Sequence, residues 1–154
     1  MIWKLYYFCL KLLGPCAWVG FYAYNHLFGV KRPRVVLLRA DGQVLLVINT
    51  LGDRRWTLPG GGAKRTEQPV EAAAREIQEE LSLTLAPERL RSMGEVRESG
   101  YTAPLFTATL SADEVAGITP DRMELYSHGW YAWNQLPRDV QPLVNKAATR
   151  LLEN

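Results

Sequence analysis

The chain has 154 residues, of which 47% are hydrophobic and 22% are charged, values that fit one globular domain and exclude a disordered chain. The net charge of +2 gives no indication of a nucleic-acid partner. Two cysteines, Cys9 and Cys16, are too few for a disulfide framework, and on a helix they would lie about 10 Å apart, too far for one disulfide. We therefore expect a reducing, cytoplasmic compartment.

Residues 1–29 are rich in aromatic side chains and contain no Asp or Glu, and we expect them to form an apolar N-terminal helical segment. The uncharged run from Leu12 to His26 includes Gly14 and Pro15 and is shorter than the ~20 apolar residues of a spanning helix. Three interpretations stay open: a helix packed on the domain, an interfacial membrane helix flanked by basic residues, and a membrane span or signal anchor. The polar sequence VKRPR then begins a second predicted unit, residues 30–154.

The following residues predict a mixture of strands and helices. The apolar, β-branched segments 34–39 and 44–48 predict two strands joined by a turn at Asp41 and Gly42. A polar loop at 51–56 and a glycine-rich segment at 57–62 lead to a helix at 69–81, with Pro69 in its first turn. Beyond it we expect strands at 83–85, 95–98, 102–110 and 130–133, a loop or short helical turn at 111–117, and a closing helix at 139–153. This order predicts an α/β domain.

The helix at 69–81 carries two separate faces. Its packing stripe comprises Val70, Ala73, Ala74, Ile77 and Leu81. Glu76, Glu79 and Glu80, at positions i, i+3 and i+4, share another face, where each like-charged pair costs roughly 0.2–0.5 kcal/mol. A bound divalent cation would remove this repulsion, because Mg²⁺ takes carboxylate oxygens as ligands. A solvated acidic face is the alternative, and these residues alone leave both open.

Three consecutive glycines, Gly60 to Gly62, precede this helix. Their backbone can approach a ligand closely, and a carbonyl there could bind a metal ion. A flexible turn after Pro59 is the alternative interpretation. The phosphate-binding pattern GxxxxGK[ST] is absent from the sequence, which excludes a P-loop.

The stretch from Gly61 to Leu83 reads GGAKRTEQPVEAAAREIQEELSL. It resembles the Nudix box, G-x5-E-x7-R-E-U-x-E-E-x-G-U, in which U is a bulky apolar residue. Eight of the nine specified positions agree, and the preceding WTLPG at 56–60 is similar to the usual lead-in. Ser82 stands where the motif has glycine, at the helix end, and Lys64 and Thr66 replace an acid and a glycine that are often found in the loop.

The resemblance implies a Nudix-type α/β/α sandwich with a mixed sheet, and a hydrolase that acts on acid anhydrides. It implies Mg²⁺ as cofactor, with Mn²⁺ as a substitute. The expected metal ligands are the Gly60 carbonyl and the carboxylates of Glu76, Glu79 and Glu80. An ion pair between Glu67 and Arg75 is expected to brace the loop against the helix.

Two residues are candidates for the catalytic base in this resemblance. Glu79 is one, and Glu124 is the other, since it lies six residues before Trp130 and is similar to a later family segment that joins the metal site. A solvated loop acid is the alternative for Glu124. We expect His128 to be a loop or substrate-facing residue and not a ligand, because it has no metal-binding partners nearby.

The expected substrate is a nucleotide-like molecule, first of all a nucleoside triphosphate cleaved by a pyrophosphohydrolase. An ADP-sugar, a dinucleoside polyphosphate (to which the position of Tyr101 gives weak support) and, if residues 1–29 contact a membrane, a lipid diphosphate remain open. Five aromatic residues are candidates to stack on a base: Trp56, Tyr126, Trp130, Tyr131 and Trp133. A non-catalytic nucleotide sensor and a membrane-surface scaffold are the rival functions, and the oligomeric state stays open.

Overall fold

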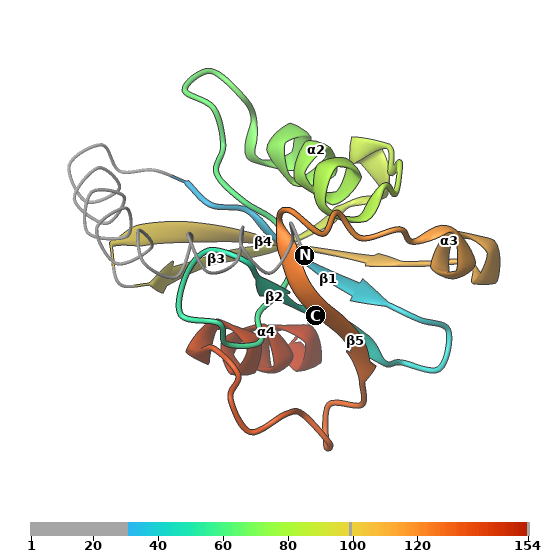
Figure 1. Ribbon diagram of the computed structural model, residues 1–154. Helices are drawn as coiled ribbons and strands as arrows, with labels where there is room; N and C mark the ends of the chain where they lie inside the picture. The colour runs from blue at the N-terminus through green and yellow to red at the C-terminus, as the bar shows by residue number, and fades with distance from the viewer. Residues whose placement is uncertain (1–30, 99, 154) are drawn as a thin grey trace.

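The computed structural model describes residues 31–98 and 100–153 (Figure 1). The apolar helical segment expected at residues 1–29, with its two cysteines, lies outside these residues. Within the part of the chain that the structure describes, no helix is both long enough and apolar enough to cross a membrane.

The described residues form one five-stranded mixed sheet. Its strands are β1 (Arg34–Leu38), β2 (Val44–Asn49), β3 (Arg91–Glu98), β4 (Tyr101–Thr109) and β5 (Leu125–Tyr131). They lie in the order β3-β4-β1-β2-β5, in which β1 and β4 run parallel and the other neighbours run antiparallel. The parallel pair at the centre and the antiparallel edges make this the mixed sheet that the sequence predicts.

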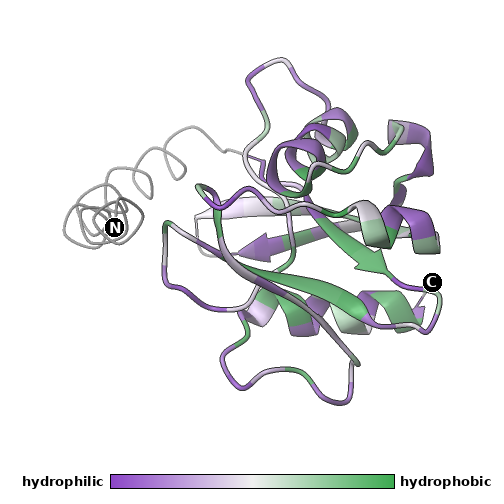
Figure 2. Cartoon of the chain, turned by 45° about the vertical axis from the view of Figure 1, so that its right-hand side comes forward, coloured by the Kyte–Doolittle hydropathy of each residue, from purple (hydrophilic) through white to green (hydrophobic). Residues whose placement is uncertain are grey.

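Two helices cover the opposite faces of the sheet (Figure 1). Along β1 the side chains alternate, so that Val35 and Leu37 pack in the core beneath α2 (Pro69–Leu81), whereas Val36 packs beneath α4 (Pro142–Glu153). Hydrophobic colours are concentrated in the central strands, and hydrophilic colours lie in the surrounding loops and on outer helix faces (Figure 2). The predicted α/β/α sandwich is thus confirmed.

Three predicted strands differ from the observed structure. The strand expected at 95–98 is β3, which begins earlier, at Arg91. Residues 83–85 are irregular and lead into the short 3₁₀ helix η1 (Pro87–Arg89), because Leu83 and Leu85 are buried in the core under α2 without joining the sheet. The strand expected at 130–133 is β5, which begins earlier, at Leu125, and ends at Tyr131. The closing helix begins at Pro142, three residues after the predicted start at 139.

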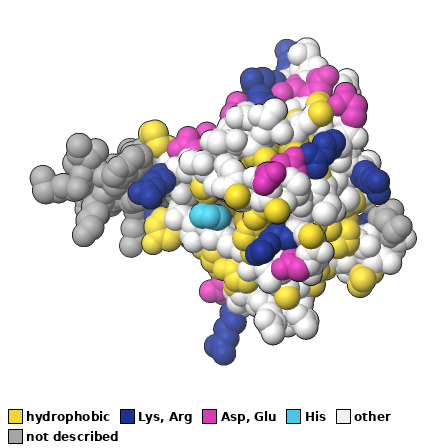
Figure 3. Space-filling model, turned by 90° about the vertical axis from the view of Figure 1, so that its right-hand side faces the viewer, with side chains coloured by type: hydrophobic (Ala, Val, Ile, Leu, Met, Phe, Trp, Pro, Cys, Tyr) yellow, Lys and Arg dark blue, Asp and Glu magenta, His cyan; other side chains and the backbone are white. Residues whose placement is uncertain are grey.

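The surface carries both signs of charge. On the face shown in Figure 3, acidic and basic side chains are interspersed with hydrophobic ones and do not form a single basic stripe. This distribution agrees with the net charge of +2 and gives no electrostatic footprint for a nucleic acid on that face.

Helix α2 has well-defined ends. Pro69 stands in its first turn, and the Glu71 side chain accepts a hydrogen bond from the backbone N–H of Gln68, as in a capping box. At the other end Ser82 adopts a left-handed conformation with φ 55° and ψ 27°, and its N–H donates to the carbonyl of Gln78. A residue with a Cβ atom is strained in this conformation, which glycine adopts without strain.

Replacement of Ser82 by glycine is therefore expected to raise the free energy of unfolding by about 0.5–1 kcal/mol. Urea unfolding should show a higher midpoint with an unchanged m value. Ser82→Ala is the matched control, because alanine keeps the Cβ atom and should give no increase. A glycine variant that is no more stable than the alanine variant would contradict the left-handed assignment.

The short helix α3 (Ala112–Gly117) is fixed by an ion pair. Glu114 accepts a hydrogen bond from the Ser111 N–H and pairs with Arg89. The Arg89 side chain, helped by the Ser111 N–H, lowers the pKa of Glu114 from 4.5 to about 2. Since the folded-state pKa is depressed, this contribution to stability is present above pH 4.5 and is lost as the pH falls toward 2.

Glu114→Gln is accordingly expected to lower stability at neutral pH by less than about 1 kcal/mol, because the pair lies at the surface. As the pH falls below 4.5, the difference between the variant and the unmodified protein should shrink, because the unfolded chain then takes up a proton at Glu114 that the folded protein takes up only near pH 2. Urea unfolding at several pH values between 3 and 7 would measure this. A difference that stays constant over this range would show that the ion pair contributes nothing.

Candidate active site

The glycine-rich segment enters the middle of the sheet. Strands β1 and β2 pair at Leu38 and Val44, next to their hairpin. Farther along, Thr57 forms an antiparallel bridge with Val47, and the Val35 N–H donates to the carbonyl of Pro59 over 3.0 Å. Residues 57–59 thus lie between the two diverging strands and deliver the three glycines to the sheet beside the start of β1.

Two of the glycines are required by close contacts. Gly60 has φ 125°, and a Cβ atom there would lie 2.4 Å from the carbonyl oxygen of Pro33. A Cβ atom at Gly61 would lie 2.2 Å from Oε2 of Glu76. At Gly62, by contrast, no atom of a described residue lies within 4 Å of an added Cβ. The missing side chains therefore let the Glu76 carboxylate lie directly against the loop backbone.

Glu80 is buried beneath this loop. Its side chain is 5% exposed, and its Oε2 accepts a hydrogen bond of 2.8 Å from the Gly60 N–H. Burial raises the pKa of Glu80 to about 8, with smaller contributions from the negative charges of Glu76 and Glu124. The positive charge of Arg34 and the Gly60 N–H act in the opposite direction. Without a further cation, the Glu80 carboxylate is thus poorly compensated.

Arg75 links the loop to helix α2. Its Nε and Nη2 donate to the two oxygens of Glu67 over 2.8 and 3.0 Å, and Nη2 also donates to the carbonyl of Gly62. Its Nη1 donates to Glu76 over 2.8 Å and to Glu79 over 2.7 Å. The guanidinium lowers the pKa of Glu67 to about 2. The expected pair of Glu67 and Arg75 is present, and the same guanidinium also holds Glu76 and Glu79.

The loop that carries Glu124 is fastened to the end of α2. The Asp121 N–H donates to the carbonyl of Glu80 over 2.9 Å, and the Thr50 N–H donates to the carbonyl of Glu124 over 2.8 Å. Desolvation of the carboxylate, followed by the charges of Glu76, Asp121 and Glu79, raises the pKa of Glu124, although the residue as a whole is exposed. Glu124, distant in sequence, therefore lies within electrostatic range of the α2 carboxylates.

These residues fit a hard divalent cation by their chemistry. Their donors are carboxylate oxygens beside a loop backbone, which is the ligand type that Mg²⁺ takes. Burial raises the pKa of both Glu80 and Glu124, and the negative charges of neighbouring carboxylates add to each shift. Among the described residues, no three acidic, histidine or cysteine side chains already surround one point as metal ligands. Arg75 accounts for this in part, since it holds Glu76 and Glu79.

Arg34 is a residue at this site that the sequence did not single out. It is buried, and its Nε and Nη1 have no hydrogen-bond partner among the described residues. Its charge acts on Glu80, and its Cα lies beside Gly60. The available signal was an arginine in the segment RVVLLR. It stands two residues before the core residue Val36 and therefore on the same face of the strand.

The other sequence candidates lie around the sheet. His128 is exposed and pairs with Val47 across β5 and β2. Tyr101 is partly buried on the α4 side, where the Arg32 guanidinium lies 5.5 Å from its ring. Four of the five aromatic candidates are partly buried against the two cores: Trp56, Trp130, Tyr131 and Trp133. The fifth, Tyr126, is exposed.

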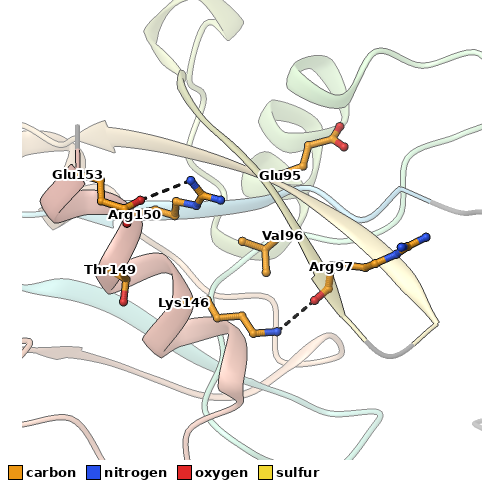
Figure 4. A pocket seen from close by; sticks show the side chains of 7 residues that line it. All are labelled: Glu95, Val96, Arg97, Lys146, Thr149, Arg150 and Glu153. Atoms are coloured by element: carbon orange, nitrogen blue, oxygen red, sulfur yellow. Dashed lines mark hydrogen bonds and ion pairs between the residues drawn. The ribbon is translucent and has the colours of Figure 1, made fainter.

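A groove of about 450 Å³ lies elsewhere, between β3 and α4 (Figure 4). Its charged side chains largely satisfy one another: Lys146 donates to the carbonyl of Arg97 over 3.1 Å and to Glu98 over 2.7 Å, and Arg150 pairs with Glu153. Its lining contains neither the glycines nor the α2 carboxylates. The carboxylate cluster is therefore the stronger candidate for chemistry.

Comparison with known proteins identifies the family of the chain. The family model described as the NUDIX domain matches residues 31–152. The RNA pyrophosphohydrolases of Stenotrophomonas maltophilia strains K279a and R551-3 are each 45% identical over 65 residues, which is 41% of this chain and 30% of theirs. The matched segment thus spans about a third of the length of these curated relatives.

Solved structures share the fold over most of the chain. A MutT NUDIX hydrolase from Burkholderia pseudomallei superposes with a TM-score of 0.62 at 27% identity, covering 77% of this chain and 98% of the other. An ADP-ribose pyrophosphatase from Streptococcus suis 89-1591 gives a TM-score of 0.61 at 20% identity, covering 80% and 87%. A UDP-X diphosphatase gives 0.65 at 21% identity, covering 80% and 61%. The last two likenesses concern the fold alone.

Proposed function

The chain belongs to the Nudix family, and from this premise we propose that it is a Mg²⁺-dependent hydrolase that cleaves a diphosphate bond in a nucleoside diphosphate-linked substrate. One observation carries the proposal: the Glu80 carboxylate is buried and accepts a hydrogen bond from the Gly60 N–H, and burial, with smaller contributions from the charges of Glu76 and Glu124, raises its pKa to about 8. Carboxylates crowded in this way favour a bound cation over a merely solvated acidic face.

The proposed metal ligands are the Gly60 carbonyl and the carboxylates of Glu76, Glu79 and Glu80. When bound, Mg²⁺ neutralises diphosphate oxygens and lowers the pKa of a coordinated water molecule. Arg75 keeps its two hydrogen bonds to Glu67 and so holds the loop against α2. This fixed loop places the Gly60 backbone next to Glu80, where the ligands are required to converge.

Glu124 and Glu79 are the two candidates for the base that accepts the proton of the attacking water. The structure favours Glu124, because its pKa is raised and an efficient base has a pKa closer to the working pH. Glu79 is instead held by the Nη1 of Arg75 over 2.7 Å. In this assignment Glu79 acts chiefly as a metal ligand.

The substrate that we propose first is a nucleoside triphosphate. The relatives from Stenotrophomonas maltophilia are named RNA pyrophosphohydrolases, a name that implies a nucleotide-linked diphosphate. A sensor that binds a nucleotide without cleaving it is the alternative, and the three retained carboxylates of the box support catalysis against it. We further propose that residues 30–154 form the catalytic domain.

The test is a substrate panel with the full chain. Nucleoside di- and triphosphates, ADP-ribose and dinucleoside polyphosphates are incubated with Mg²⁺, with Mn²⁺ or with EDTA, and phosphate and pyrophosphate release is measured. We expect turnover that requires the metal and that Glu80→Gln lowers by about 10²- to 10³-fold. Nucleotide binding by a folded protein that turns over none of these substrates would contradict the hydrolase and support the sensor.

A further inference from the structure

Tyr126 differs from the other aromatic candidates because its side chain is 51% exposed. Trp56 and Tyr131 pack edge to face, with ring centroids 5.1 Å apart, in the core under α4. Trp130 packs on the opposite core and has the Arg39 guanidinium 5.5 Å from its ring. Tyr126 therefore presents an aromatic face to solvent, where a ligand can contact it.

The backbone places Tyr126 on an irregularity of β5. Ile48 pairs with Ser127 and Asn49 pairs with Leu125, so the register passes over Tyr126 as the extra residue of a bulge. A bulge in an edge strand redirects a side chain and often lies next to a functional site. Glu124 precedes Tyr126 by two residues, a span of at most about 7 Å of extended chain. The Tyr126 backbone therefore lies within about 7 Å of the backbone of Glu124, one of the carboxylates of the proposed site.

A strained arginine accompanies the tyrosine. The Arg54 guanidinium lies 4.5 Å from the ring centroid of Tyr126. Arg54 has φ 54°, in the left-handed region, which is costly for a residue other than glycine. Its neighbour Arg55 turns away and donates to the carbonyl of Val140 over 2.6 Å. The strained backbone and the stacked guanidinium both mark Arg54 as a positioned group.

Exposed apolar side chains flank the pair. Among the described residues, four large hydrophobic side chains are classed as exposed, and three of them are Leu51, Met123 and Tyr126. Leu51 follows Thr50, and Met123 precedes Glu124, so the Thr50–Glu124 hydrogen bond fastens the two segments that carry them. The two segments joined by this hydrogen bond therefore both carry exposed apolar side chains.

We propose that the Arg54–Tyr126 pair receives the nucleobase of the substrate by stacking. This inference rests on the proposed function and specifies which end of the substrate the pair contacts. A base has a flat π face for the tyrosine and the guanidinium, and polar edges that tolerate water. A lipid tail would gain little from a guanidinium, and an inorganic polyphosphate would gain nothing from a ring. The pair therefore distinguishes a nucleotide from the other diphosphates considered.

The experiment compares Tyr126→Ala with Tyr126→Phe in the full chain. The substrates are the best nucleoside triphosphate of the panel and inorganic tripolyphosphate, which lacks a base. Tyr126→Ala is expected to raise KM for the nucleotide about tenfold or more, with kcat little changed, and to leave KM for tripolyphosphate unaltered. Tyr126→Phe keeps the ring and should behave as the unmodified protein. Arg54→Ala should resemble Tyr126→Ala more weakly, whereas Leu152→Ala, on distant α4, should have no effect.

Equilibrium binding of a non-hydrolysable nucleoside triphosphate analogue in EDTA keeps this test separate from catalysis. If no substrate is turned over, the proposed function fails, but weaker binding of the analogue by Tyr126→Ala alone would still support the inference. Equal binding and equal KM for Tyr126→Ala and the unmodified protein would overturn it. An equal loss on tripolyphosphate would overturn it as well, since Tyr126 would then act on the loop of Glu124 and not on a base.

Discussion

Glu80→Gln is expected to lower kcat/KM for the best nucleotide by about 10²- to 10³-fold while leaving the protein folded. Glutamine has nearly the same shape and can still accept the hydrogen bond from the Gly60 N–H, so the loop keeps its anchor. It carries no charge, however, and one of its two terminal groups is an amide nitrogen that does not bind Mg²⁺. The loss therefore falls on metal binding.

The same change should not destabilise the metal-free protein. Burial raises the pKa of Glu80 to about 8, which means that the folded state disfavours the ionised carboxylate. A neutral amide avoids this cost, so the free energy of unfolding should be equal to or higher than that of the unmodified protein. Thermal unfolding with and without Mg²⁺ measures both effects, because a ligand that binds the folded state raises Tm.

We expect Mg²⁺ to raise Tm for the unmodified protein and not for Glu80→Gln. Glu71→Gln, on the first turn of the same helix, is the matched control, and it should keep both the metal response and the activity. A Glu80→Gln variant that retains metal-dependent turnover would remove Glu80 from the proposed ligands. Retained metal binding without turnover would give Glu80 a catalytic role in place of metal binding.

The three glycines should respond to alanine in three different ways. Gly60→Ala is expected to destabilise the fold by about 3 kcal/mol or more, because its Cβ would meet backbone, the Pro33 carbonyl, at 2.4 Å in a left-handed conformation. Gly62→Ala should change stability by less than about 0.5 kcal/mol, since the space around it is open. The loss of stability in Gly61→Ala should lie between these two values, because the added Cβ meets the Glu76 side chain, which can move.

Gly61→Ala is therefore expected to reduce activity much more than stability. The new methyl group would displace the Glu76 carboxylate, whose Oε2 lies 2.2 Å from the position of the added Cβ. A displacement of this size costs roughly 10²-fold in rate when a group must be held in place. Urea unfolding and kcat/KM for all three variants make the comparison. Equal losses of activity in Gly61→Ala and Gly62→Ala would show that the Glu76 position is not critical.

Helices and strands could be predicted from the sequence where nearby residues determine their ends and their buried faces. Helix 69–81 was predicted to the residue, because Pro69 and the apolar stripe define its start and its buried face and Ser82 ends it. The predicted strand at 130–133 begins later than the observed β5. The reason is that β5 is an edge strand whose sequence, LYSHGWY, has little apolar alternation. A bulge at Tyr126 disturbs the alternation further.

The burial of the candidate site residues depends on contacts distant in sequence. The helical period places Glu76, Glu79 and Glu80 on one face, yet Glu79 has a 46% exposed side chain whereas Glu80 is 5% exposed. The difference arises because the glycine loop, twenty residues earlier, covers Glu80. Arg34 is likewise unremarkable in a strand until the loop and Glu80 are placed beside it. The helical period identifies the face that carries the three glutamates, but only tertiary packing determines which of them is buried.

The insertion of residues 57–59 between β1 and β2 has a consequence for cooperativity. Ordinary surface loops open at little cost and independently of the body of a protein. Here Thr57 exchanges two backbone hydrogen bonds of 2.9 Å with Val47, and Pro59 accepts one from Val35, so the loop shares the ladder of the sheet. Its backbone amides should exchange with solvent as slowly as those of central strands. The glycine segment should then open only when the whole domain unfolds, so the site forms in the same folding step as the core.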